Sequence, residues 1–178
     1  MPSTFAQGFL SGIGHPVIGI DHLLFIIGIG LLAAFTSRKL LLPLAFIGGT
    51  WIGAALHLFG LNVSFAEVGI IASVLLMAVA VIGNVRLSVP VFAALIAFAG
   101  LFHGYAYAES IFGADAGALY AYLFGFAVIQ FAIAFAAASV FELVQKRSGP
   151  LATAGARVSG GAMVGVAMVA ISSMLAPV

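Results

Sequence analysis

Two imidazoles and a carboxylate stand close together at the head of a long apolar segment. The stretch reads His15-Pro16-Val17-Ile18-Gly19-Ile20-Asp21-His22. Ionisable side chains are costly inside a membrane, and they usually mark a functional site there. Imidazole nitrogen and carboxylate oxygen without sulfur suit divalent ions such as nickel, cobalt and zinc better than copper(I). This combination of residues predicts a site for a divalent transition-metal ion.

The spacing of the two histidines limits how they can share an ion. His15 and His22 are seven residues apart, so a regular helix would place them on one face, about 10 Å apart along its axis. Pro16 favours the first turn of a helix. This would leave His15 in the segment before the helix, free to bend back towards His22. Asp21 points in another direction, and it is either a direct ligand or an acceptor that orients an imidazole.

The composition places these residues in an integral membrane protein. Of 178 residues, 64% are hydrophobic and only 6% are charged, whereas the surface of a soluble domain is rich in charge. Cysteine is absent, which excludes disulfides and thiolate metal sites. Six Lys and Arg residues cannot form a basic face, so we expect lipids and a metal ion as partners and no nucleic acid.

The apolar runs divide into segments long enough to cross the hydrocarbon core, which takes about 20 residues. Continuous rather than alternating apolar runs favour helices over strands. We therefore predict an all-α bundle of six transmembrane helices in a single domain, 1–178, with a short non-spanning segment at 5–14. The predicted spans are 17–36, 40–61, 65–84, 88–107, 117–144 and 155–176. Glycine pairs such as Gly49/Gly53, Gly100/Gly104 and Gly161/Gly165 predict close helix packing.

The basic residues predict the orientation in a bacterial inner membrane. All of them lie in or beside the loops that follow the first, third and fifth spans, which the positive-inside rule makes cytoplasmic. They are Arg38, Lys39, Arg86, Lys146, Arg147 and Arg157. Both termini would then be external. This favours a chain from which a preceding segment has been removed, and the alternative is that the short segment 5–14 inserts without a signal peptide. We also expect the tyrosines at 105, 107, 120 and 122 to form an aromatic belt at the outer boundary.

This topology brings all four histidines to the external side. The metal ligands we expect are His22 and His103, at the outer ends of the first and fourth spans, joined by His15 and Asp21. His57, Glu67 and Glu109 are secondary candidates on the same side. His57 could instead be an interfacial residue, Glu67 could stabilise the start of a helix, and Glu109 could be a solvated loop residue.

Three stretches resemble the HupE/UreJ family of membrane proteins. The first motif of the family resembles the stretch that consists of His15, five residues, Asp21-His22 and then Leu23-Leu24-Phe25. The segment Gly100-Leu101-Phe102-His103-Gly104-Tyr105-Ala106-Tyr107 resembles its second, a Phe-His-Gly motif, and 65–73 resembles the third-helix pattern.

The resemblance implies a nickel or cobalt permease that supplies hydrogenase or urease maturation. Its metal-handling residues would be His15, Asp21, His22 and His103. The chain differs from the second motif at Tyr107, where the family commonly has a histidine, and Glu109 stands one residue earlier than the glutamate of the motif.

We predict a transport protein rather than an enzyme. The ion would be captured outside and passed to the cytoplasm. However, the inner halves of the spans offer no charged pathway, only polar groups such as Thr36, Thr50, Ser73 and Asn84. A non-transporting, metal-binding accessory protein is therefore an alternative, and a haem-binding protein with histidine axial ligands is a further one. The sequence is also compatible with a homo-oligomer.

Overall fold

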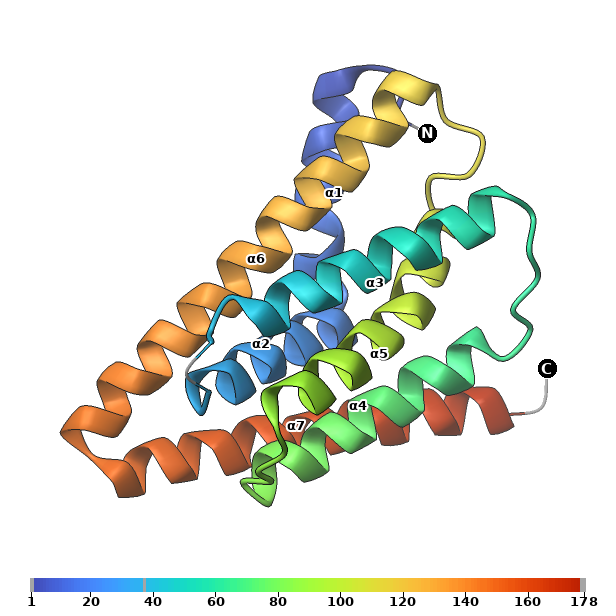
Figure 1. The fold of residues 1–178 in the computed structure, drawn as a ribbon. Helices are drawn as coiled ribbons and strands as arrows, with labels where there is room; N and C mark the ends of the chain where they lie inside the picture. Colours follow the sequence, from blue (N-terminus) through green and yellow to red (C-terminus); the bar gives the residue numbers. More distant parts are fainter. Residues whose placement is uncertain (1, 37, 177–178) are drawn as a thin grey trace.

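The computed structural model describes residues 2–36 and 38–176, and every regular element in them is an α-helix. This confirms the predicted all-α class for that part of the chain. Figure 1 shows α2, α3, α4, α5 and α7 packed together, with α1 and the first half of α6 extending beyond them. In chain order the helices are α1 (Phe5–Ile18), α2 (Ile20–Ala34), α3 (Leu41–Leu58), α4 (Ala66–Ile82), α5 (Val89–Glu109), α6 (Ala116–Arg147) and α7 (Gly149–Leu175).

The first predicted span, 17–36, is not one helix. α1 ends at Ile18, Gly19 is extended, and α2 begins at Ile20 at an angle of 81° to α1. Pro16 lies inside the last turn of α1 rather than in the first turn of the next helix. His15 is accordingly helical, and the expectation of a non-helical lead-in was wrong. The residues at the bend itself, Ile18, Gly19 and Ile20, are uncharged, so their hydropathy gives no sign of it.

Glycines allow α1 to pack along the first half of α6. A Cβ on Gly8 would overlap the backbone of Ala118, and one on Gly12 would overlap the backbone of Tyr122. The predicted segment 5–14 is thus part of a longer helix that lies against α6. With 14 residues, α1 is still too short to cross the hydrocarbon core by itself.

The helices α3 and α5 form a similarly close pair. Gly49 and Gly53 of α3 lie against backbone carbonyls of α5, while Gly100 and Gly104 of α5 lie against the backbone of α3. This confirms close packing at two of the three predicted glycine pairs. The third prediction was wrong, because a Cβ on Gly161 or Gly165 would meet no atom within 4 Å.

The length and hydropathy of the helices describe a multi-pass membrane protein. α3, α5, α6 and α7 could each cross a membrane, and α1 with α2 could do so as a bent pair. α4, with 17 residues, is an apolar helix one residue shorter than α3, the shortest of these candidates. Six crossings and external termini remain predictions, and the terminal residues Met1 and Val178 lie outside the described part of the chain.

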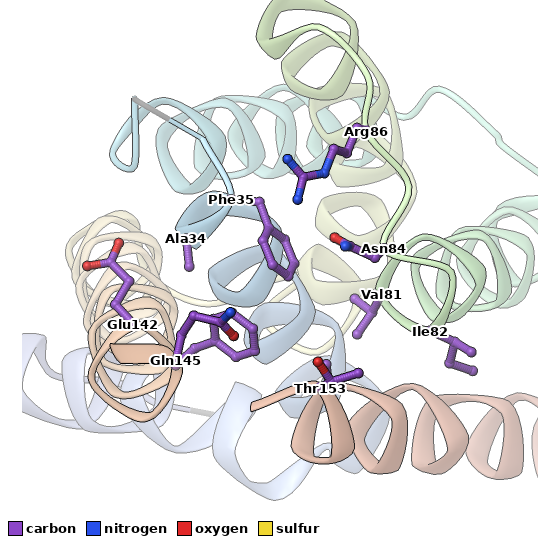
Figure 2. Close-up of a pocket in the computed structure, with 11 residues that line it drawn as sticks. Ala34, Phe35, Val81, Ile82, Asn84, Arg86, Glu142, Gln145 and Thr153 are labelled. Atoms are coloured by element: carbon purple, nitrogen blue, oxygen red, sulfur yellow. The ribbon is translucent and has the colours of Figure 1, made fainter. Parts of the chain in front are cut away.

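Basic residues follow or end three helices: Lys39 comes after α2, Arg86 after α4, and Lys146 and Arg147 lie in the last turn of α6. The C-terminal ends of α2, α4 and α6 meet the start of α7. These ends surround a pocket of about 170 Å³, whose lining includes Arg86, Glu142 and Gln145 (Figure 2). We call it the basic-end pocket. Glu142 also forms an ion pair with Lys39. The opposite end carries the histidines, because His22 lies at the start of α2 and His103 near the end of α5.

Candidate metal-binding site

The bend between α1 and α2 brings two predicted ligands together. His15 lies in the last turn of α1 and His22 in the first turn of α2. Their rings are stacked with centroids 5.7 Å apart, instead of the roughly 10 Å that separates such residues along a straight helix. The 81° bend therefore brings His15 towards His22. We had expected a non-helical segment before the helix to have this effect.

The third histidine comes from α5. His103 is fully buried, and its ring centroid is 5.5 Å from that of His22. The predicted juxtaposition of the first and fourth spans is thus present, with His22 between the other two rings. His15, His22 and His103 are called the histidine cluster below.

Asp21 lies at the edge of this cluster. Its Oδ2 is 3.1 Å from Nδ1 of His22, and its side chain is 38% exposed. The Nδ1 atom is buried and has no hydrogen-bond partner, so the two groups are close without being aligned for a hydrogen bond. A small rotation of either side chain would make Asp21 an acceptor that orients the imidazole, which is a common arrangement beside metal-bound histidine.

Tyr107 occupies the centre of the cluster. Its ring centroid is 4.4 Å from His22, 5.3 Å from His15 and 6.2 Å from His103. Its hydroxyl is 3.4 Å from Nδ1 of His103. Tyr107 and Tyr122 are both buried, so the expectation that they belong to an outer aromatic belt was wrong. The position of Tyr107, four residues after His103, already places the two on one helix face.

Hydroxyl groups of two other helices lie within hydrogen-bond distance of two of the imidazoles. Tyr122 of α6 has its hydroxyl 2.9 Å from Nδ1 of His15, and Ser73 of α4 has its hydroxyl 2.9 Å from Nε2 of His103. Sequence reasoning listed Ser73 only as a polar group of the inner half, and it missed Tyr122 as a partner of His15. The two contacts join residues 107 and 30 positions apart in the chain, so no local pattern indicates them.

Aromatic side chains close the cluster on the side facing the middle of the bundle. Phe25 stacks on His103 with centroids 4.5 Å apart, and Phe46 lies edge-on to the same ring. Phe126 is 4.2 Å from Tyr107 and 5.9 Å from His15, again between centroids. Phe25, Phe46 and Phe126 are each about 1% exposed, and together they are called the aromatic floor.

The secondary candidates lie apart from the histidine cluster. His57 lies in the last turn of α3 beside Tyr105 and Phe112, with ring centroids 4.6 and 5.6 Å away. Glu67 is exposed in the first turn of α4, where a carboxylate favours the helix dipole. Glu109 is exposed at the last residue of α5. The structure therefore brings none of these three to His22.

The geometry of the cluster is close to what one ion would need. Because metal–nitrogen bonds are about 2.0–2.1 Å long, two imidazoles on one ion have ring centroids roughly 4.5–6.5 Å apart. The observed separations of 5.5 and 5.7 Å lie in that range. Within the described residues no three His, Asp or Glu side chains converge on a single point. Binding would thus require rotation of the rings, including release of His103 from Ser73.

Comparison with known proteins adds an independent observation. The model of the family described as HupE / UreJ protein matches residues 2–171. The chain is also 30% identical over 102 residues to Protein HupE of Rhizobium leguminosarum bv. viciae. That alignment covers 56% of this chain and 53% of the relative, so the chain matches about half the length of that protein. No solved structure gives a significant match.

Proposed function

The chain belongs to the HupE/UreJ family, and on that premise we propose that it is a permease for divalent nickel, with cobalt as the alternative ion. The ion would be captured from outside by His15, His22 and His103, with Asp21 orienting His22. It would then be released to the cytoplasm, where it could supply a nickel enzyme such as hydrogenase or urease. We place the protein in the bacterial inner membrane with its basic loops inside.

The proximity of the three histidine rings beside a broken helix is the observation that carries this proposal. Membrane transporters commonly build substrate sites where a transmembrane helix is interrupted, because the break frees polar groups at the depth of the membrane. Here the break between α1 and α2 supplies His15 and His22 from its two sides. α5 supplies His103, whose ring centroid lies 5.5 Å from that of His22. Three imidazoles without sulfur favour nickel, cobalt or zinc.

A specific observation also favours the accessory alternative. The aromatic floor closes the histidine cluster towards the middle of the bundle. Beyond it, Gly30 of α2 packs directly against Ala134 of α6. A protein with this single conformation would bind the ion without passing it on. Transport therefore requires a second conformation in which α2 and α6 separate.

Nickel uptake into reconstituted vesicles tests the proposal. Vesicles containing the wild-type chain and a trapped metal-sensitive fluorophore should take up nickel. His22→Ala should reduce the rate by roughly tenfold or more, because loss of a ligand weakens metal affinity at least as much as loss of the groups that orient it. His57→Ala is the matched control, since this histidine lies apart from the cluster, and it should transport at the wild-type rate.

The outcomes separate the two candidate functions. Nickel binding by the wild type without uptake would favour the accessory protein. Equal signals from wild-type, His22→Ala and protein-free vesicles, together with no nickel binding in detergent, would overturn both.

A further inference from the structure

Gln130, in the middle of α6, is a buried polar residue that the histidine cluster does not use. It is 1% exposed, and neither Oε1 nor Nε2 has a hydrogen-bond partner. Among the described residues, the other buried side-chain polar atoms without a partner are one nitrogen each of His22 and His57. Most serine and threonine hydroxyls in the spans are satisfied locally. The hydroxyls of Thr50 and Ser139, for example, donate to carbonyls of their own helices. A buried amide with both ends unpaired is therefore unusual in this molecule.

Packing alone does not explain an amide at this position. A buried polar group without a partner destabilises a fold, and leucine of similar size would fill the same space without that penalty. Polar residues retained at the depth of a membrane commonly mark substrate or ion pathways. Unpaired buried polar atoms likewise point to a missing ligand or water.

The position of Gln130 along α6 connects it to the histidine cluster. Phe126, one turn before it, packs against His15 and Tyr107. Gly30 of α2 packs against the backbone of Ala134, which lies one turn after Gln130. Gln130 thus lies just beyond the aromatic floor and just before the close contact between α2 and α6. An ion leaving the cluster along α6 would reach this amide before it met the closure.

The same helix continues to the basic-end pocket. Glu142 lies twelve residues after Gln130, about 18 Å further along the axis. It lines that pocket with Gln145 and Arg86 (Figure 2). Tyr122, which contacts His15, lies eight residues before Gln130, about 12 Å in the other direction. One helix therefore carries polar groups at the start, the middle and the end of a crossing.

We propose that the amide oxygen of Gln130 is an intermediate ligand for the transported divalent ion, between the histidine cluster and the basic-end pocket. This inference rests on the proposed permease function. A neutral oxygen donor binds such an ion more weakly than three imidazoles do. Weak intermediate binding suits transport, because an ion must be able to leave each site that it enters.

Three measurements on Gln130→Leu test this inference: nickel uptake into vesicles, nickel affinity in detergent and the thermal midpoint. We expect uptake to fall by roughly tenfold or more, affinity to stay within about threefold of wild type, and the midpoint to be unchanged or higher. Gln130→Glu, which keeps an oxygen donor, should retain more uptake than Gln130→Leu. Ser139→Leu puts the same side chain on α6 at an exposed position, and it should leave uptake unchanged.

Two results would overturn the inference. Wild-type uptake by Gln130→Leu would show that the amide is not on the pathway. A lower thermal midpoint, with affinity and uptake falling together, would show that the amide has a structural role. If the wild type itself takes up no nickel, the proposed permease function fails first. Measuring uptake by the wild type thus distinguishes failure of the permease proposal from failure of the proposed role of Gln130 alone.

Discussion

Tyr107 is the residue at which this chain departs from the motif that it otherwise resembles, and it lies at the centre of the histidine cluster. The centroid of its ring is 4.4 Å from that of His22, whereas the centroids of His15 and His103 are 5.7 and 5.5 Å from it. A histidine at position 107 would therefore place a fourth imidazole among the other three. A neutral phenol is a weak ligand for nickel, so we infer that Tyr107 shapes the site without binding the ion.

This inference predicts the effect of two substitutions at Tyr107. Tyr107→His should bind nickel roughly tenfold more tightly than wild type, which corresponds to about 1.4 kcal/mol of binding free energy. Tyr107→Phe removes only the hydroxyl, and it should leave the affinity within about threefold of wild type. Titration calorimetry in detergent measures both. Weaker binding by Tyr107→Phe, with no gain from Tyr107→His, would instead make the phenol oxygen a ligand.

The broken pair of α1 and α2 is the element that the site depends on. α1 carries one proposed ligand, His15, and the position of α1 is set by its contact with α6. Gly12 makes this contact close, because its α-carbon lies directly against the backbone of Tyr122. Tyr122 in turn has its hydroxyl at His15. A shift of α1 away from α6 would therefore move His15 out of the cluster.

Two glycine substitutions on α1 test this dependence. Gly12→Ala should displace α1 and lower nickel affinity by roughly tenfold, with a loss of stability of about 1–3 kcal/mol from overpacking. Gly14→Ala is the matched control, because a Cβ there would meet only Ile18 at an ordinary 3.8 Å. Calorimetry and thermal unfolding in detergent check both. Wild-type affinity in Gly12→Ala would mean that His15 is not a ligand.

Part of the helical framework could be read from the sequence. Four predicted spans begin and end within three residues of the first and last residues of α3, α4, α5 and α6. They are 40–61, 65–84, 88–107 and 117–144. Uninterrupted apolar runs bounded by polar loops indicate both ends of a helix. The bend at Gly19 could not be predicted this way, since its two direct neighbours, Ile18 and Ile20, are apolar. The start of α7 at Gly149 was also missed, because the predicted span began only at 155.

The whole molecule has a histidine end and a basic end joined by α6. The sequence could predict that His15, His22 and His103 lie on one side, because helix order alone decides this. It could not predict that Tyr107, Tyr122 and Ser73 surround them. Those contacts depend on which helices pack together, as α1 does with α6 and α4 with α5. Gln130 was missed for the same reason, since its unpaired amide is visible only in the packed bundle.

The central claim is that one divalent ion binds between the α1–α2 break and α5. Anomalous diffraction at the nickel edge, on crystals of the nickel-loaded protein, tests it most directly. We predict one strong peak about 2.0–2.1 Å from imidazole nitrogens of His22 and His103, with His15 beside them. This peak should be absent in His22→Ala. A nickel peak only at another position, or no peak at saturating nickel, would contradict the claim that the ion binds between the α1–α2 break and α5.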